Sequence, residues 1–254
     1  MTSLVGHSVL ITGGGSGLGE GTARHFAARG ARVTITGRRP GPLARVTGEL
    51  GEACTAVVGD VTVAADRRRM IDRAVEHGGG TLHTLVNNAG NMYRGPLDEL
   101  DEHQLLEVFH SNVIAGIMLT QGALAPLEAA GGAVIFIGSV HSQRAFPGAS
   151  PYAATKGAIE TLTGVLAAEL GPRGIRVSCV RPGAVFTEIN QRAGLADDAQ
   201  ALARLQGLAS AHALGRIGTA DEIAQAIAYL ATAAWTTGSV LTVDGGLSLG
   251  VTNA

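Results

Sequence analysis

Short β-branched runs alternate along this chain with longer segments of helical period, and this alternation constrains the fold more than any other feature. Strands are predicted at 8–12, 32–36, 55–58, 84–87, 133–138, 176–180 and 240–243. Helices are predicted between them, at about 18–29, 40–50, 63–77, 99–125, 151–170 and 220–232. The strands are apolar on both faces, as in a sheet that helices cover on two sides. This order predicts an α/β fold with a doubly wound parallel Rossmann sheet of about seven strands.

The chain is expected to form one domain over residues 1–254. Its 254 residues could hold one large α/β unit or two small domains. No linker, internal repeat or low-complexity segment divides them. Only the segment near 187–212 interrupts the strand–helix rhythm, between a late strand and its helix, and a substrate lid is expected there.

Composition argues against several classes of protein. Hydrophobic residues make up 46% of the chain, but no apolar run approaches the ~20 residues that a membrane span needs. A net charge of −2 leaves no basic footprint for nucleic acid. The eight histidines and the two cysteines, Cys54 and Cys179, lack metal-ligand or redox spacing, and the N-terminus carries no export signal. We expect a cytoplasmic protein without a metal site and without a membrane or nucleic-acid partner.

A glycine-rich turn, "TGGGSGLG" at 12–19, follows the first predicted strand directly. Gly13, Gly17 and Gly19, with Ser16 and Leu18 between them, lie at the entrance to a helix. Glycine lets the backbone approach a pyrophosphate, which the helix N-terminus then stabilises. The spacing differs from the general G-x-G-x-x-G fingerprint, and a tight strand-to-helix connection is the alternative. The position after the first strand favours a dinucleotide site.

The end of the second predicted strand indicates which dinucleotide binds. Gly37 stands where an acidic residue would accept hydrogen bonds from the ribose hydroxyls, and Arg38 and Arg39 follow it. This pattern favours NADP(H). Two arginines that only solvate a loop are the alternative, and Ser16 supplies no second cation in the glycine turn, so use of NAD(H) stays open.

Lys156 is the only lysine of the chain, and the other 18 basic residues are all arginine. Lysine offers a compact ammonium that an arginine fork cannot replace. Tyr152 precedes it by one helical turn, so both side chains project from one helix face. A cation beside the phenol favours its phenolate form and fits it for acid–base work. Such a pair is also common on helix surfaces, which is the plainer interpretation.

Several motifs together resemble the classical short-chain dehydrogenase/reductase family over essentially the whole chain. They follow in the family's order: "TGGGSGLG" (12–19), "GDVT" (59–62), "NNAG" (87–90), Asn112, Ser139, "YAATK" (152–156), "RPG" (181–183), Thr187 and "DGG" (244–246). The spacing of thirteen residues from Ser139 to Tyr152 also agrees. Two small departures, Gly138 where a serine is common and Arg181 where an asparagine is common, are not expected to touch the chemistry.

The resemblance implies a catalytic set of Ser139, Tyr152, Lys156 and Asn112 around a nicotinamide. Ser139 would bond the substrate oxygen, and Asn112 would hold a water that links Lys156 to solvent. Asp60 is interpreted as an acceptor for the adenine amino group, as the cap of the helix near Val63, or as both. The implied cofactor-binding residues are Gly13, Ser16, Gly17, Leu18, Gly19, Arg38, Arg39, Asp60, Val61, Asn88, Ala89, Gly90, Tyr152, Lys156, Pro182, Gly183, Val185 and Thr187.

The function expected from these residues is NAD(P)(H)-dependent interconversion of a secondary alcohol and a ketone. The loop "GSVHSQRAFPGASPY" places His141, Gln143 and Arg144 between the serine and the tyrosine, and it looks like the loop of glucose 1-dehydrogenases. A 3-oxoacyl reductase stays open, as does a loop-capping role for His141. A non-catalytic dinucleotide sensor is the alternative from another class, and it would be expected to lack Tyr152 or Lys156. The family also implies a homotetramer, in which the segments 99–125 and 151–170 pair.

Overall fold

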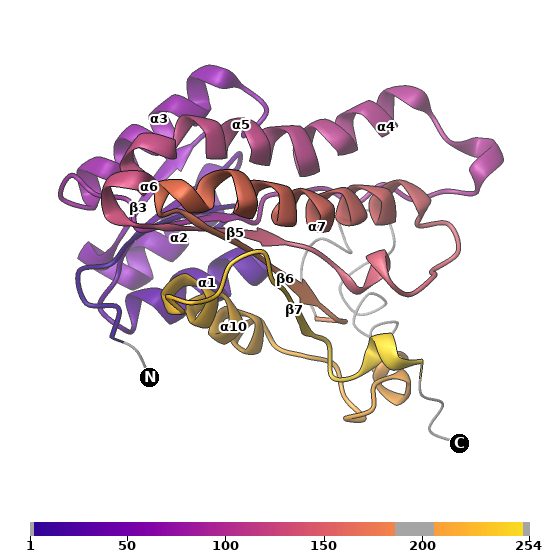
Figure 1. Cartoon of the computed structure of the whole chain (residues 1–254). Coiled ribbons are helices and arrows are strands. Elements are labelled where there is room, and N and C mark those ends of the chain that lie inside the picture. The colour runs from indigo at the N-terminus through magenta and orange to yellow at the C-terminus, as the bar shows by residue number, and fades with distance from the viewer. Residues whose placement is uncertain (1–2, 186–205, 251–254) are drawn as a thin grey trace.

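The computed structural model describes residues 3–185 and 206–250, and within them a parallel sheet forms the centre of the molecule (Figure 1). Its seven strands lie in the order β3-β2-β1-β4-β5-β6-β7. They are β1 (Ser8–Thr12), β2 (Arg32–Gly37), β3 (Cys54–Val58), β4 (Thr84–Asn87), β5 (Ala133–Ile137), β6 (Arg176–Pro182) and β7 (Val240–Val243). The strand order reverses at β1 and β4, and ligands bind outside the carboxyl ends of strands at such a switch point. The predicted fold class is confirmed.

Helices cover both faces of this sheet. One face carries α1 (Gly17–Ala27), α2 (Pro40–Leu50) and α10 (Ala220–Thr232). The other carries α3 (Ala64–His77), α4 (Glu102–Phe109), α5 (Ala115–Gly122), α6 (Leu124–Ala130) and α7 (Ser150–Leu170) (Figure 1). Short 3₁₀ turns occupy Gly51–Ala53, Leu97–Glu99, Val140–Ser142, Gly171–Arg173, Ala209–Ala211 and Leu247–Leu249.

Strand β1 shows why the sheet is buried on both sides. Val9 and Ile11 pack into the core under α1 and α10, whereas Leu10 packs into the core under α3 and α5. Successive side chains of a strand point to opposite faces, so a strand with helices on both sides must be apolar throughout. This geometry places every strand's carboxyl end at one edge of the sheet, where the loops are free to form a site.

The segment 99–125 departs from the single helix that its sequence predicts. A turn at Leu97–Glu99 precedes α4, the π-helical stretch His110–Ile114 separates α4 from α5, and α6 follows as a distinct helix. The π-helical stretch contains the buried Asn112, whose side-chain contacts come from distant parts of the chain. Such insertions often mark functional sites, and sequence periodicity does not reveal them.

The helices also bear on the question of a membrane span. Among the residues described, no single helix is both long and apolar enough to cross a bilayer, although the bent pair Glu102–Gly122 and Leu124–Ala130, which meet at 61°, passes by length and composition.

Candidate active site

A cleft of about 530 Å³ lies along the carboxyl edge of the sheet. The predicted site residues on its wall are Gly13, Ser16, Gly17, Leu18, Arg38, Asp60, Val61, Asn88, Ala89, Gly90, Ser139, His141, Tyr152, Lys156, Pro182, Gly183 and Val185. Thr187 and residues 187–205 of the expected lid lie outside the described residues. The glycine turn and the Tyr152–Lys156 pair, which are far apart in sequence, therefore open into one space.

Five predicted site residues do not line this cleft. They are Gly19, Arg39, Asn112, Gln143 and Arg144. Gln143 is exposed, and Arg144 donates from Nη1 to Leu247 O over 2.7 Å while its guanidinium lies 5.9 Å from the Phe146 ring centroid. Neither side chain lines the cleft, although Arg144 contacts two residues that do, Phe146 and Leu247, and the substrate role of Gln143 and Arg144 stays a prediction.

The glycine turn has the geometry that close approach of a ligand requires. Gly13 and Gly17 adopt φ angles of +67° and +55°, which L side chains rarely adopt. A Cβ at Gly19 would lie 2.3 Å from Gly13 O, so Gly19 is needed for close packing behind the turn. The first N–H groups of α1 have no partners within the helix, and Gly17 and Leu18 present this end of the helix to the cleft.

The "NNAG" segment is tied to the glycine turn by hydrogen bonds. Asn88 Nδ2 donates to Thr12 O over 2.7 Å, and Thr12 Oγ1 accepts from the backbone N–H groups of Asn88 and Ala89 at 3.0 and 2.9 Å. Asn87 Nδ2 donates to Thr120 Oγ1 on α5. The asparagine side chains are thus scaffold, and the backbone from Asn88 to Gly90 forms the cleft wall.

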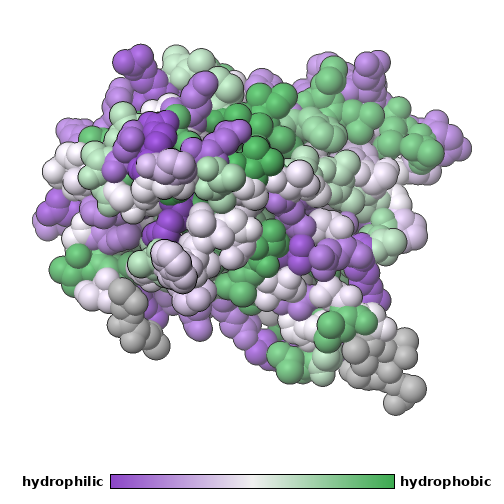
Figure 2. Space-filling view, in the orientation of Figure 1, coloured by the Kyte–Doolittle hydropathy of each residue, from purple (hydrophilic) through white to green (hydrophobic). Residues whose placement is uncertain are grey.

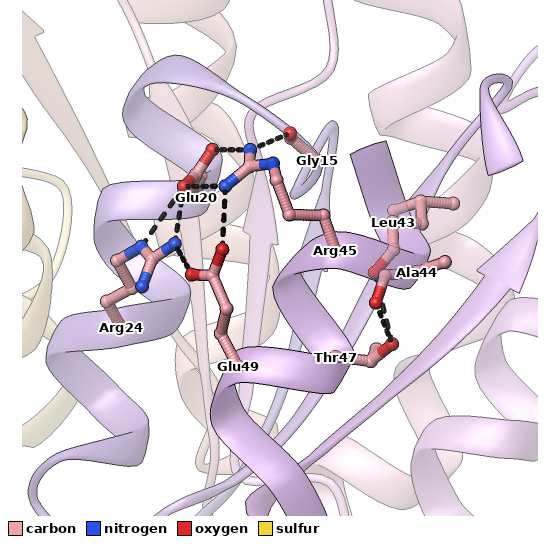
Figure 3. Close-up of polar contacts among 8 residues, drawn as sticks. All are labelled: Gly15, Glu20, Arg24, Leu43, Ala44, Arg45, Thr47 and Glu49. Carbon is pink, nitrogen blue, oxygen red and sulfur yellow. Dashed lines mark hydrogen bonds and ion pairs between the residues drawn. The ribbon is translucent and has the colours of Figure 1, made fainter. Parts of the chain in front are cut away.

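An exposed cluster of four charged side chains, Glu20, Arg24, Arg45 and Glu49, joins α1 to α2 beside the glycine turn (Figure 3). Arg45 donates from both terminal nitrogens to Glu20, at 2.9 and 2.6 Å, and its Nη2 lies 3.4 Å from Gly15 O. Hydrogen bonds from Arg45 are the main reason that the pKa of Glu20 lies below its usual value. We call these four side chains the rim cluster.

Arg38 and Asp60 face each other at the end of β2. Arg38 Nη1 lies 3.8 Å from Asp60 Oδ2, and both residues line the cleft. Asp60 Oδ1 accepts from the backbone and hydroxyl of Thr62 at 2.9 and 2.8 Å. Val63 is the N-cap of α3 and no side chain caps that helix, so the capping role considered for Asp60 is wrong. The carboxylate instead stabilises the turn before the helix.

Helix α7 brings Tyr152 and Lys156 to the cleft on one buried face. Lys156 Nζ donates to Ile137 O at the end of β5 over 2.7 Å and lies 5.4 Å from the Tyr152 ring centroid. The buried ammonium is thereby anchored to the sheet while it stays beside the phenol. This is an arrangement that a planar guanidinium could not adopt in the same space.

Ser139 and His141 lie together where β5 ends. Ser139 Oγ accepts from the backbone N–H of His141 and lies 3.1 Å from His141 Nδ1. The imidazole stacks on Phe146, at 4.3 Å between centroids, and meets Tyr152 edge-on at 5.2 Å. Burial, with smaller contributions from Arg94 and Lys156, lowers the pKa of His141 to about 4. His141 is therefore a neutral group in direct contact with Ser139.

Asn112 lies behind the cleft rather than on its wall. Its Nδ2 donates to Asn91 O and Thr155 Oγ1 at 2.9 and 3.1 Å, and its Oδ1 accepts from Asn91 N and Ser111 Oγ at 2.8 and 3.1 Å. These contacts engage both the nitrogen and the oxygen of the amide, although Ser111 shares its single hydroxyl hydrogen with Val108 O. The side chain joins the loop after β4 to α7, and its role in holding a water stays a prediction.

Sequence reasoning did not identify several residues that form the cleft wall. They are Met92, Arg94, Glu107, His110, Ser111, Phe146, Leu208 and Leu247. Met92 and Arg94 follow "NNAG" within a few residues, so their position could have been inferred. Glu107 and His110 carry no such signal, because only the path of α4 past the sheet edge brings them there. Within the described residues, no group of three His, Cys, Asp or Glu side chains could hold a metal ion.

Nearly the whole chain is similar in sequence to known reductases and dehydrogenases. A family model described as enoyl-(acyl carrier protein) reductase matches residues 13–248. An uncharacterized oxidoreductase of Methylorubrum extorquens is 36% identical over 97% of this chain and 100% of that protein. Glucose 1-dehydrogenase of Gluconobacter oxydans is 34% identical over 96% of this chain and 92% of its own.

A solved structure agrees with this relationship at the level of the fold. The 3-ketoacyl-(acyl-carrier-protein) reductase of Brucella melitensis, complexed with NADH, is 31% identical, with 97% of this chain and 100% of that chain covered and a TM-score of 0.88. The motifs, the seven-stranded sheet and the relatives agree. On this basis the chain is an oxidoreductase that belongs to the short-chain dehydrogenase/reductase family.

Proposed function

We propose that this protein interconverts a secondary alcohol and a ketone with a nicotinamide dinucleotide bound in the cleft. The observation that carries the proposal is that the glycine turn and Ser139, Tyr152 and Lys156 line one and the same cleft. The left-handed glycines at positions 13 and 17 fit a pyrophosphate, since a side chain there would be strained. When bound, the dinucleotide supplies or accepts the hydride.

The chain's own residues handle the proton. Tyr152 gives its phenolic proton to the substrate oxygen, or takes it in the reverse direction, and Ser139 Oγ hydrogen-bonds the same oxygen as charge develops. Lys156 supports the phenolate with its ammonium. Asn112 supports the site by fixing α7 through Thr155.

For the cofactor we propose NADP(H) in preference to NAD(H). Arg38 lies on the cleft wall and can approach a 2′-phosphate, and Gly37 presents no acid to repel it. Arg39 is the N-cap of α2 and does not line the cleft, so it contributes less than its neighbour. The carboxylate of Asp60 lies near Arg38 and competes with a 2′-phosphate for its guanidinium. This competition weakens the preference for NADP(H) without abolishing it, since Asp60 also accepts a hydrogen bond from Thr62.

For the substrate we propose a small polyhydroxylated compound of the sugar or polyol class. His141 supports this choice, because its Nε2 is buried and has no hydrogen-bond partner among the described residues, while the residue lines the cleft next to Ser139. A substrate hydroxyl would satisfy that nitrogen. Glu107 and His110 add polar groups to the same wall. A 3-oxoacyl thioester is the second candidate, favoured by the likeness to the Brucella reductase.

The experiment is a panel of sugars, polyols and β-keto esters, assayed with NADP and NAD by nicotinamide absorbance. We expect turnover with a sugar or polyol. Tyr152→Phe should lower kcat by about 10²–10⁴-fold because the ring stays and the proton donor is lost. The variant should still bind the cofactor, measured by fluorescence titration. Near-normal turnover in Tyr152→Phe would contradict the mechanism, and absorbance changes with β-keto esters alone would reverse the choice of substrate.

We also propose a homotetramer in the cytoplasm. Leu106, Ile114, Met118 and Val165 are exposed on α4, the π-helical stretch, α5 and α7, and Figure 2 shows apolar residues over α5 and α4 on the face in view. The cytoplasm is supported by the two cysteines, which are free and buried, with thiol pKa values that burial raises to about 12. Light scattering at micromolar concentration tests the assembly, and a monomer there would contradict it.

A further inference from the structure

A buried ion pair joins β6 to α7 near the turn that carries Ser139. Arg181, at the end of β6, donates from Nε and Nη2 to the two carboxylate oxygens of Glu160 on α7, at 2.8 and 2.6 Å. The two side chains are 9% and 13% exposed, and Arg181 Nη1 also donates to Thr242 Oγ1 on β7. Two parallel bonds to a carboxylate fix orientation as well as charge. The pair therefore holds α7, β6 and β7 in one relative position.

Glu160 lies on the same face of α7 as Tyr152 and Lys156, since the three residues follow at intervals of four. Its Oε1 lies 2.6 Å from Ser142 Oγ, and that hydroxyl also lies 2.7 Å from Ser139 O. Ser142 shares its single hydroxyl hydrogen between the two acceptors. The helix of the proposed proton donor is thus tied, through one serine, to the turn that carries Ser139.

Gly138 explains how the carboxylate reaches this place. A Cβ at position 138 would lie 2.9 Å from Cys179 Sγ and 3.0 Å from Glu160 Oε1, so a side chain there would require the thiol and the carboxylate to shift. Arg181 then neutralises the buried charge of Glu160, as a buried carboxylate requires. The two departures from the family pattern, at positions 138 and 181, are therefore parts of a single arrangement around Glu160.

From this geometry we infer that Glu160, held by Arg181 and acting through Ser142, is a positioning residue that sets Ser139 relative to Tyr152. The inference rests on the proposed catalytic roles of Ser139 and Tyr152. Glu160 itself does not line the cleft, so it acts on the reaction through the residues it holds, and its direct tie to Ser139 is the hydrogen bond with Ser142. A displacement of about 1 Å in a catalytic group can cost on the order of 10²-fold in rate, so a hydrogen bond that prevents it has a measurable effect.

Ser142→Ala is the test variant, because it removes the tie and leaves the buried ion pair intact. We expect kcat to fall by about tenfold with little change in the KM for the cofactor. Ser142→Thr keeps the hydroxyl and should keep most of the activity. Thr47→Ala on α2, which also removes a hydroxyl bonded to backbone carbonyls but lies beside the rim cluster (Figure 3), should leave kcat unchanged.

Repeating the Ser142→Ala change in a Ser139→Ala variant distinguishes a positioning role from a general disruption of the site. In Ser139→Ala the group to be positioned is gone, so adding Ser142→Ala should cause no further loss of kcat. If the double variant lost kcat by the product of the two single losses, the inference would be overturned. A wild-type kcat in Ser142→Ala would overturn it as well.

A spectroscopic readout keeps the test independent of turnover. The imidazole of His141 contacts Ser139, so its NMR resonances report the shape of the turn, and His141→Gln assigns them. Ser142→Ala should shift these resonances and Thr47→Ala should not. Unshifted resonances would overturn the inference, whereas shifted resonances in a protein without turnover on the panel would support it and count against the proposed function alone.

Discussion

Two of the charged clusters of this protein pair arginine with glutamate in opposite surroundings. In the rim cluster, Arg45 and Glu20 have side-chain exposures of 47% and 18% (Figure 3). In the buried pair, Arg181 and Glu160 have exposures of 9% and 13%. Each cluster connects a helix that lines the cleft to a neighbouring element. Water competes for the first pair and is largely excluded from the second, so loss of one partner has very different consequences.

The largest effect is expected from Glu160→Ala, which leaves Arg181 buried without its partner. Breaking a buried pair on one side costs about 3–5 kcal/mol of unfolding free energy. Denaturant titration measures this loss. The double variant Glu160→Gln with Arg181→Asn removes both charges and should be closer to wild type. If Glu160→Ala alone were as stable as wild type, water would have to reach Arg181, and the two clusters would not differ in how strongly their charges interact.

The next effect is a loss of stability at mildly acidic pH, to which His141 in the cleft contributes. The folded pKa of His141 is about 4, below its ordinary 6.5, because burial disfavours the imidazolium. Between these values the unfolded chain binds more protons, so stability is lost as the pH falls from 6.5 toward 4, by about 3 kcal/mol. His141→Gln should reduce this slope in denaturant titrations across that range, whereas His103→Gln, an exposed site, should not.

The stability that the rim cluster contributes is lost over a different range of pH. The pKa of Glu20 is lowered by its arginine partners, so its contribution is complete above the ordinary carboxyl pKa of 4.5 and is lost only as the pH falls through the lower folded pKa. A loss confined to pH below 4.5, with no change in His141→Gln, would contradict the contribution assigned to His141. His7 should contribute to the slope as well, since burial lowers its pKa to about 4.

At the adenosine end, the expected effect is on selectivity. A charge-assisted hydrogen bond from Arg38 to a 2′-phosphate is worth about 1.5–3 kcal/mol, so kcat/KM should favour NADP by roughly ten- to a hundredfold. Gly37→Asp with Arg38→Leu should reverse the preference, and the new side chain has room, because a Cβ at Gly37 meets only Leu43, at 3.7 Å. Wild-type kcat/KM values that favour NAD would mean that Arg38 is held by Asp60 and turned from the cofactor.

The smallest effect is expected from Glu20→Ala in the rim cluster. Exposed ion pairs contribute about 0–1 kcal/mol, so the free energy of unfolding should change within that range. High salt should remove most of the difference, because exposed pairs are screened. A loss as large as that in Glu160→Ala would show that the rim cluster supports the glycine turn more than its exposure indicates.

Much of the fold could be predicted because its signals are local. The strand predicted at 84–87 is β4, the predicted helix 40–50 is α2, and the others agree within two or three residues except at 99–125. Period and β-branching are properties of neighbouring residues, and a sheet covered on both sides reinforces them. The single helix predicted at 99–125 was wrong: a π-helical stretch interrupts it, and that stretch holds Asn112, which bonds to Asn91 and Thr155, residues remote in sequence.

The sequence by itself determined the elements, the glycine turn after β1 and the Tyr152–Lys156 pair, because each is written in residues within about one or two helical turns of each other. Only the tertiary structure decided which side chains enter the cleft. His141 lines the cleft, whereas Gln143 and Arg144 do not. Glu160 pairs with Arg181, which lies 21 positions further along the chain. Such pairings depend on how helices pack on a sheet, and that packing sets burial, which in turn decides how strongly two charges interact.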